Sequence, residues 1–386
     1  GRQHSPQQDA DNDSQHLGSA AVQRSPEESF SCLLLQILHY SDCKSTNNYA
    51  LCIMNYELFC NFAHRMMEQT VKKPRLEWLD ALRGFTMILV VSYHVAQYGF
   101  GETWKTSSSM SFLMLFRMPL FFFVSGFLAY KATQVWNLRN LGGLLLKKVR
   151  VQLVPTVVFF LLAMAILYKH FWPALDGALR SQFKGGYWFT LVLLYMFIIY
   201  YPFAWLESML PRKSWIPITL LFVASLLVYE SCYLPKYFYW AFGYRRAHPM
   251  FLWESSIIQL MQYFPFFLYG NIVHRYWNQA QRLMDSRWFF PVVVIVLVFA
   301  TLDAQKWHTL RMAWAVIPLT LAKFLLLTIA FMYFRHYKDS FSKARPVGWT
   351  LQYIGRRTLD IYLIHFFFMP ELPAIGDFFK SFPHNL

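Results

Sequence analysis

Long apolar stretches separated by short, basic loops dominate the chain from residue 79 onward. They lie near residues 79–98, 110–130, 151–168, 187–205, 215–230, 252–273, 288–302, 311–334 and 358–369. About 20 apolar residues are needed to cross the hydrocarbon core of a bilayer, and a lipid-exposed backbone has to satisfy its own hydrogen bonds. The pattern therefore predicts an all-α fold, a polytopic transmembrane helical bundle of about nine to ten helices. The fifth, seventh and ninth runs are short for a full crossing.

The N-terminal region has a different pattern. Residues 1–31 are polar and rich in Gln, Ser and Asp, a composition typical of disorder. Residues 32–64 contain short apolar runs without a sustained period, and no signal-peptide pattern is visible. We therefore expect two parts: residues 1–65, a disordered or non-native extension, and residues 66–386, the transmembrane domain.

Composition and charge agree with a membrane protein. Hydrophobic residues make up 56% of the chain and charged residues 15%, whereas soluble domains carry about 25% charged residues. The net charge of +15 would suit a nucleic-acid partner, but the Lys and Arg residues lie in the loops, where they set orientation in a bilayer. Nineteen of them fall on the side of the first helix's start and eight on the other, which predicts a cytoplasmic start and no nucleic-acid partner. The five Cys show no C-x-x-C spacing, so no metal site is expected.

The first predicted helix carries an arginine and a histidine on one face. Arg83 and His94 are separated by three turns plus about 20° of rotation, and by about 16 Å along the axis. Arg at a helix end can simply reach the headgroups and His can simply bond a neighbour, but intramembrane ionisable residues are usually functional. The spacing suits a long ligand with an anionic end at Arg83 and a reactive group at His94. With an ordinary pKa near 6.5, His94 is the candidate general base.

Further charged residues support this interpretation. Lys147, Lys148 and Arg150 precede the third run, on the same side as Arg83. Such a cluster is either ordinary positive-inside anchoring or a site for the phosphates of a nucleotide-bearing donor. Asp80 lies three residues before Arg83, close enough on a helix to pair with it and orient it.

The second run contains Arg117, an intramembrane charge that would be costly without a partner. Pro119 allows a kink in this helix, and Ser125 with Gly126 allows a close approach of another helix. The run of Phe residues in the same segment is typical of packing.

Two other segments are less decisive. The aromatic segment 233–253 suits either a membrane belt or an acceptor sugar. Its basic residues are Arg245, Arg246 and His248. In the ninth run, Asp360 and His365 are five residues apart, which is 140° of rotation at 100° per residue, so they are not predicted to form a dyad.

Several ordered motifs together resemble a known family. They are L-D-A-L-R-G at 79–84, V-V-S-Y-H at 90–94, M-P-L-F-F-F-V-S-G-F at 118–127, G-Y-W-F at 186–189 and L-D-I-Y-L-I-H at 359–365. Over about residues 74–369 the chain resembles the membrane-bound acyltransferase family 3, polytopic enzymes that O-acetylate bacterial surface polysaccharides and related glycans. The family's Arg-x10-His pattern falls on Arg83 and His94, and its basic motif resembles Lys147 and Arg150.

The resemblance implies an acetyl-CoA-dependent O-acetyltransferase in a cell membrane, most directly the bacterial inner membrane. Acyl-CoA would dock from the cytoplasm at Arg83 and the 147–150 cluster, with His94 as the base. From their positions in the sequence we expect Asp80, Lys148 and Arg117 to support this site. The acceptor would be a hydroxyl of a glycan or lipid-linked sugar, and no cofactor would be bound permanently. The chain departs from the family in having Arg117 where many members have His, and in ending soon after the ninth run where members commonly have ten helices.

Two alternatives remain open from the sequence. A proton- or anion-coupled transporter would use His94 and the intramembrane Arg residues as a pathway, although no inverted repeat is obvious. An inactive relative with a scaffold role is the other. A transporter moves a labelled substrate without consuming acetyl-CoA, and an acyltransferase consumes it.

Overall fold

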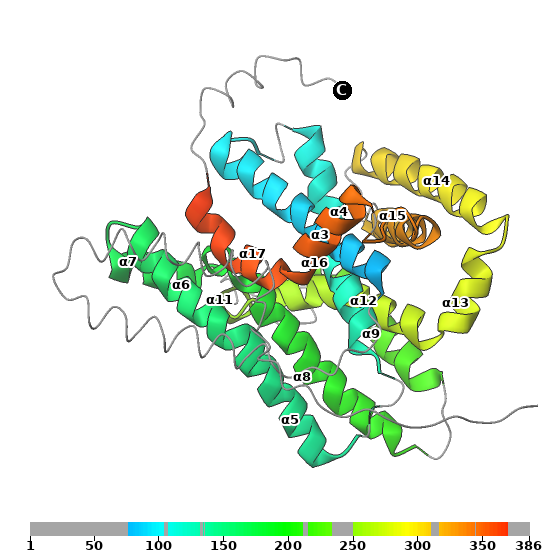
Figure 1. Ribbon diagram of the computed structural model, residues 1–386, viewed down its shortest axis with the longest axis horizontal. Coiled ribbons are helices and arrows are strands. Elements are labelled where there is room, and N and C mark those ends of the chain that lie inside the picture. Colours follow the sequence, from blue (N-terminus) through cyan, green and yellow to red (C-terminus); the bar gives the residue numbers. More distant parts are fainter. Residues whose placement is uncertain are drawn as a thin grey trace, which may run out of the picture. The chain divides into compact units, whose positions relative to one another are not determined.

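The computed structural model describes residues 76–103, 107–131, 134, 136–210, 215–233, 250–309, 316–343 and 345–369. All of them belong to one compact unit, Pro74–Leu386. Within these ranges the secondary structure is helical and contains no strand, so the predicted all-α class is confirmed (Figure 1). The predicted extension 1–65 and the basic residues of the outer aromatic segment (Arg245, Arg246 and His248) lie outside the described residues.

The described helices follow one another along the chain from residue 77 to residue 368. In chain order they are α3 (Glu77–His94), η1 (Val95–Gly99), α4 (Ser108–Ala129), α5 (Leu138–Lys148), η2 (Val149–Leu153), α6 (Val154–Leu167), α7 (Phe171–Arg180), η3 (Lys184–Gly186), α8 (Trp188–Ser208), α9 (Ile216–Tyr233), α11 (Met250–Glu254), α12 (Ile257–Arg275), α13 (Trp277–Met284), α14 (Phe289–Thr309), α15 (Val316–His336), α16 (Pro346–Arg356), α17 (Thr358–Ile364) and η5 (His365–Phe368). The segments η1 and η2 are π-helical, and η3 and η5 are 3-10 turns.

Five segments of the described chain are long and apolar enough to cross a membrane. They are Glu77–Gly99, Ser109–Ala129, Leu138–Leu167, Trp188–Ser208 and Ile317–His336. A sixth is present if Trp277–Met284 and Phe289–Asp303, which are bent by 84°, form one broken span. The fifth and ninth predicted runs become shorter apolar helices, Ile216–Cys232 and Thr358–Phe368. The described helices thus support a membrane protein, but the predicted count of nine to ten spans is not confirmed.

The third span begins earlier than the apolar run indicates. The Asn137 side chain accepts a hydrogen bond from the Asn140 amide at 2.7 Å and so caps a helix that continues to Leu167. The basic cluster therefore lies inside this helix and not in a loop before it. Pro155 lacks an amide donor and its ring would crowd the carbonyl four residues back, and the wider π-helical turn η2 lies where this misfit falls.

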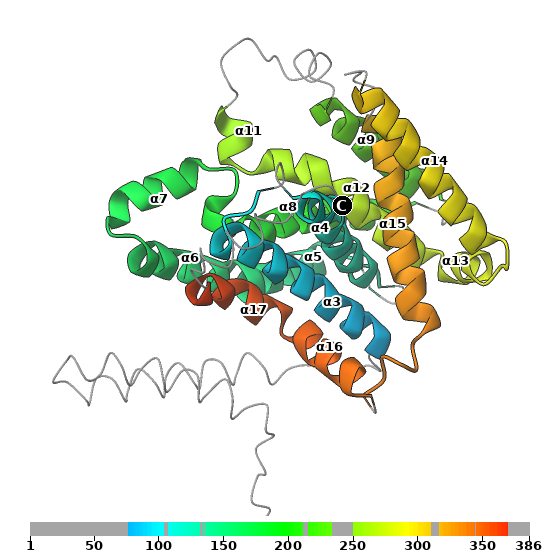
Figure 2. The ribbon, with the colours of Figure 1, turned by 90° about the horizontal axis from the view of Figure 1, so that it is seen from above.

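Glycines bring two pairs of helices into backbone contact. A Cβ atom at Gly84 of α3 would lie 1.9 Å from a backbone oxygen of α16, and one at Gly355 would lie 1.8 Å from a backbone oxygen of α3. Gly126 of α4 and Gly270 of α12 form an equivalent contact, with 1.8 and 1.9 Å. Figure 2 shows α16 running beside α3. Small residues allow such close packing in membranes, and the predicted close approach at Gly126 is confirmed.

Outward faces of the peripheral helices are apolar. Val157 and Leu161 of α6 and Ile295 and Phe299 of α14 are all exposed. Lipid tails satisfy such a surface without the cost that water would impose, so these faces are suited to the bilayer. The candidate site lies instead between α3, α4, α5, α8 and α17, where Arg83, Lys148 and Gln152 line a cavity.

Candidate active site

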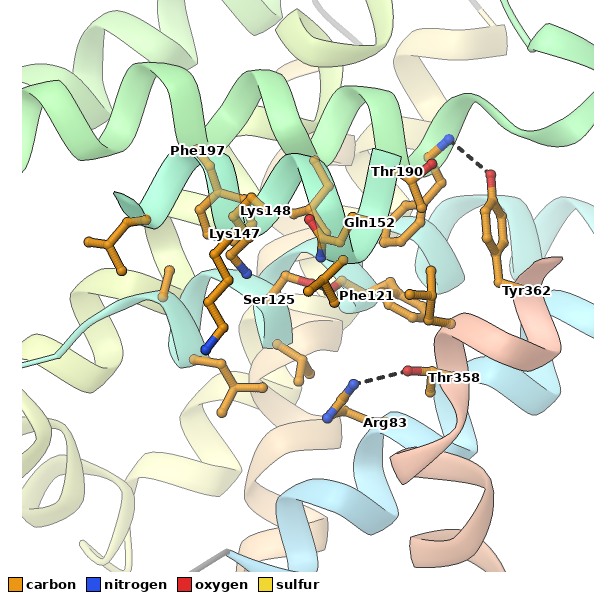
Figure 3. A pocket seen from close by; sticks show the side chains of 18 of the residues that line it. Arg83, Phe121, Ser125, Lys147, Lys148, Gln152, Thr190, Phe197, Thr358 and Tyr362 are labelled. Carbon is orange, nitrogen blue, oxygen red and sulfur yellow. Dashed lines mark hydrogen bonds between the residues drawn. The ribbon is translucent and has the colours of Figure 1, made fainter. Parts of the chain in front are cut away.

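A basic cavity of about 310 Å³ opens between α3, α4, the α5–η2 helix, α8 and α17. Its cations are Arg83, Lys131, Lys147 and Lys148. None of the described residues that line it is acidic. In Figure 3 the two lysines of α5 and the guanidinium of α3 face this space from different helices. A concave, partly apolar site with convergent positive charge is suited to an anionic ligand.

Arg83 is held in place by two neighbours. Its Nη2 donates a hydrogen bond to the hydroxyl oxygen of Thr358 at 2.9 Å (Figure 3). Its Nη1 lies 3.6 Å from the Asp80 carboxylate. The pairing expected from the three-residue spacing of Asp80 and Arg83 is therefore present. Thr358 comes from α17, 275 residues further along the chain, and sequence reasoning did not find it.

The three cations of the basic cluster in the third span differ in whether they line the cavity. Lys147 is exposed and lines the cavity, while the partly buried Lys148 also lines it and places its Nζ 3.9 Å from the centre of the Phe197 ring. Arg150 is exposed and is not among the residues that line the cavity. The cation–π contact at Phe197 holds the Lys148 ammonium at the wall of the cavity.

Gln152 is a further polar residue of this wall that the sequence did not single out. It lies in the π-helical segment η2 and lines the cavity, and its Oε1 is buried without a hydrogen-bond partner among the described residues. A buried acceptor without a partner is uncommon, so the cavity offers a hydrogen-bond acceptor to whatever fills it. The described ranges contain no group of three or more His, Cys, Asp or Glu side chains placed to hold a metal ion.

A second, much smaller chamber of about 30 Å³ contains His94 and Arg117. Three aromatic residues, Phe121, Phe189 and Tyr362, line both this chamber and the basic cavity. The Phe121 and Phe189 rings are 4.6 Å apart at their centres, and those of Phe189 and Tyr362 are 5.5 Å apart. The two spaces are therefore neighbours divided by one layer of aromatic side chains.

His94 is paired with a histidine from the far end of the chain. Its Nδ1 lies 2.9 Å from Nε2 of His365, which is 271 residues away, and the two rings stack at 5.1 Å. The other ring nitrogen of His365, Nδ1, lies 2.8 and 3.1 Å from the carbonyl oxygens of Tyr362 and Ile361. None of the hydrogen-bond contacts that the structure gives for His365 is to Asp360.

These contacts assign the ring protons of the neutral pair. A carbonyl oxygen only accepts, so Nδ1 of His365 carries the proton and its Nε2 is an acceptor. His94 must then donate from Nδ1, which leaves its Nε2 unprotonated and able to take a proton. The arrangement repeats the logic of a base oriented by a hydrogen-bonded partner, here with a second imidazole as the orienting group.

The motif at 186–189 positions the helix that carries His365. Tyr362 of α17 donates a hydrogen bond from its hydroxyl to the Gly186 carbonyl at 2.8 Å and accepts one from the Phe189 amide at 3.2 Å. Tyr187 donates to the Leu363 carbonyl at 3.0 Å. Gly186 has φ of +99°, a conformation in which L side chains are strained. Two motifs far apart in sequence thus form one structural unit that holds His365 against α3.

Arg117 of α4 completes the small chamber. Its Cζ lies 3.2 Å from the centre of the Tyr93 ring, and its Nε and Nη1 are buried without a hydrogen-bond partner among the described residues. The Arg83-to-His94 separation expected from the sequence is preserved, since α3 is α-helical over Glu77–His94. All seven predicted site residues are therefore described, and six of them line one of the two spaces or contact a residue that does, while Arg150 is exposed outside both.

A family model described as "Acyltransferase domain", that of acyltransferase family 3, matches residues 76–382. The chain belongs to this family. The match includes every predicted site residue and also His365 and the motif at 186–189, so the fold unit that forms both spaces is the acyltransferase domain.

Among curated proteins, the chain is similar to glucans biosynthesis protein C of Salmonella paratyphi B, with 22% identity over 231 residues, and to that of Salmonella typhimurium, with 22% over 229 residues. Each alignment covers 53% of this chain and 59% of the relative, so the chain spans about three fifths of the length of these relatives. No solved structure matches. Family membership and the apolar helices together support a membrane acyltransferase.

Proposed function

We propose that this chain is an integral membrane O-acyltransferase that moves an acyl group, acetyl in the first place, from acyl-CoA to a hydroxyl of a cell-surface glycan or glycolipid precursor. The observation that carries the proposal is the His94–His365 pair: its assigned protons leave a free basic nitrogen next to a cavity whose charged lining residues are all cationic. Family membership supports acyl transfer in general, and the site supports the CoA donor in particular.

The basic cavity suits the phosphates of the donor. Arg83 offers a planar set of N–H donors, and Lys147 and Lys148 offer compact charges, which together match several phosphate oxygens. Arg150 lies on the same helix, exposed outside the cavity, and is the outermost donor contact of this proposal. The roughly 16 Å between Arg83 and His94 along α3 is of the scale of a pantetheine arm. The Gln152 side-chain oxygen can accept a hydrogen bond from an amide of that arm.

The chemistry follows from the assigned protons. The acceptor hydroxyl attacks the thioester carbonyl carbon while His94 Nε2 takes the hydroxyl proton, and a new C–O bond forms. The tetrahedral intermediate then collapses, the C–S bond breaks, and the CoA thiolate leaves and receives the proton from the His94 imidazolium. The acyl ester and free CoA are the products, and His94 returns to its neutral state.

The acceptor and the location are inferred from context. The curated relatives are named for glucan biosynthesis, so a glucan hydroxyl is the first acceptor to examine. The excess of Lys and Arg on the side of the start of α3 favours a cytoplasmic donor side in a cell membrane, with the bacterial inner membrane as the first candidate.

The proposal is tested with the purified chain in lipid nanodiscs, acetyl-CoA labelled in the acetyl group and glucan oligosaccharides as acceptor. We expect label in the oligosaccharide together with release of free CoA, and a loss of about 10²- to 10⁴-fold in kcat for His94→Ala. The matched control is His336→Ala, which removes an exposed imidazole of α15. Unchanged turnover in His94→Ala would exclude His94 as the base. Movement of a labelled solute across vesicles without consumption of acetyl-CoA would favour a transporter.

A further inference from the structure

Arg117 is an intramembrane cation with unused hydrogen-bond donors. It lies within the second span, Ser109–Ala129, and forms no ion pair among the described residues. Its contact with the Tyr93 ring covers one face of the guanidinium, while Nε and Nη1 are left buried and without a partner. A guanidinium does not lose its proton in a protein, so the positive charge stays in this apolar setting.

Such an arrangement is unfavourable for the free protein. Charged side chains inside a membrane normally pair with one another or with backbone carbonyls, and burying a charge without such partners is expensive. By contrast, Lys323 of α15 is buried too, and its Nζ donates to the Tyr229 hydroxyl at 2.9 Å. The lack of hydrogen-bond partners at Arg117 Nε and Nη1 is therefore specific to this site. It points to a substrate group that binds there during the reaction.

The chamber around Arg117 limits what that group is. Its volume of about 30 Å³ accommodates one small group, and His94 lines the same space. A group placed there has both the His94 imidazole and the Arg117 guanidinium in the walls around it. The carbonyl of a small thioester fits this description, because its carbon has to be reached by a hydroxyl deprotonated by His94 and its oxygen becomes negative during the reaction.

We infer that Arg117 is a catalytic residue that binds the thioester carbonyl oxygen and stabilises the negative charge formed on it during acyl transfer. The inference rests on the proposed function and adds the electrophilic half of the site to it. When the acceptor hydroxyl attacks, its proton moves to His94 and the carbonyl electron pair moves to oxygen, where it meets the Arg117 N–H groups. Collapse returns that pair to the carbonyl and expels the CoA thiolate, which takes the proton from His94.

This role predicts where the effect of a mutation appears. The oxyanion exists only after attack, so Arg117 stabilises the transition state more than the bound donor, and its loss lowers kcat more than donor affinity. Removing one donor to an oxyanion typically lowers kcat by about 10²- to 10³-fold. If Arg117 instead held a permanent anion of the donor or acceptor, its loss would weaken binding and leave kcat unchanged.

The experiment compares Arg117→Met, Arg117→Lys and wild type in nanodiscs. We expect kcat for acetyl transfer to fall about 10²- to 10³-fold in Arg117→Met, Kd for acetyl-CoA and for CoA to stay within about threefold, and Arg117→Lys to recover part of the loss. Fluoroacetyl-CoA, whose carbonyl is more electrophilic and of nearly the same size, should show a smaller defect in Arg117→Met than acetyl-CoA does. If the role of Arg117 were purely structural, Arg117→Met would reduce kcat equally with acetyl-CoA and with fluoroacetyl-CoA.

Lys323→Met is the matched control, because it removes another buried intramembrane cation outside both spaces. If Arg117→Met does not fold, Arg117→Gln and Arg117→Lys are compared by the same kcat criterion. Retention of kcat within about threefold in the neutral variant, or a loss confined to Kd, overturns the assignment while the proposed function stands. Absence of acyl transfer by the wild-type protein overturns the proposed function and the assignment together.

Discussion

The basic cavity and the His94 chamber share three aromatic walls but differ in nearly every other property. The cavity is about ten times larger, at about 310 against about 30 Å³, and it collects cations from α3, the end of α4 and α5. The chamber holds one imidazole and one guanidinium among apolar and aromatic groups. In the basic cavity several side chains share the positive charge. In the His94 chamber one guanidinium supplies the charge and one imidazole is the basic group.

The difference shows how one membrane domain separates binding from chemistry. Charges at a wide cavity, where Lys131 and Lys147 are exposed, bind phosphates with little penalty, because water and several neighbours share the charge. In a small apolar space the same charge interacts more strongly with its surroundings. This favours stabilisation of a charged transition state, but burying the charge there is costly while no substrate is bound. Mutations in the cavity should therefore change donor affinity, and mutations in the chamber should change kcat.

The largest effect after loss of His94 or Arg117 is expected from His365. Replacing His365 with Leu removes the acceptor that holds the His94 Nδ1 proton, so kcat should fall about 100-fold while donor Kd stays within about threefold. His365→Gln restores an acceptor oxygen and should recover part of the loss. Stopped-flow release of CoA measures both variants, with His336→Ala as the control. Equal losses in the Leu and Gln variants would contradict a positioning role for His365.

The cations of the cavity should act on affinity. Replacing both Lys147 and Lys148 with Gln removes two phosphate contacts, so Kd for acetyl-CoA should rise about 10- to 30-fold with kcat little changed. The effect should shrink at high salt, since salt screens exposed charges. Calorimetric titration with acetyl-CoA measures Kd for the double variant. The control is Lys338→Gln, which changes an exposed lysine elsewhere. A fall in kcat at saturating donor would break the proposed division between the two spaces.

The aromatic layer between the two spaces should control the size of the acyl group. Phe121→Ala removes one of the three shared side chains and should connect the cavity with the chamber. We expect the preference for acetyl-CoA over octanoyl-CoA, as a ratio of kcat/KM values, to fall about 10-fold, since one methylene in an apolar pocket already changes such a ratio by about 10-fold or more. The test measures kcat/KM for acetyl-CoA and for octanoyl-CoA in Phe121→Ala and in the wild type. An unchanged ratio would show that the layer does not select the acyl chain.

The smallest effect is expected at Gln152. Its unpartnered Oε1 should accept one hydrogen bond from the donor, and a single neutral hydrogen bond contributes about 0.5–1.5 kcal/mol. Gln152→Leu should therefore raise Kd for acetyl-CoA about 2- to 10-fold and leave kcat unchanged. A binding titration with CoA and acetyl-CoA tests this. If both values of Kd are unaffected, the pantetheine arm does not pass along η2.

Local patterns were sufficient for part of the fold and site. The all-α class and the α3 helix with Arg83 and His94 on it followed from the sequence, because hydrophobic periodicity and helical geometry act over a few turns. The start of the third span was misplaced, because a polar cap at Asn137 and a weakly apolar first segment lie outside the apolar run. The count of spans was likewise uncertain where an apolar run was short or where a bend of 84° interrupts it.

By itself the sequence determined that the chain is a helical, membrane-suited acyltransferase-like protein with a cation and a base on one helix face. Only the tertiary structure decided that His365 orients His94, that Thr358 bonds Arg83, and that Arg117 keeps two donors without a partner among the described residues. The physical reason is that these surroundings are formed by helices far apart in the chain. Their side chains meet only after close packing at Gly84, Gly355 and similar contacts has set how the helices lie against one another.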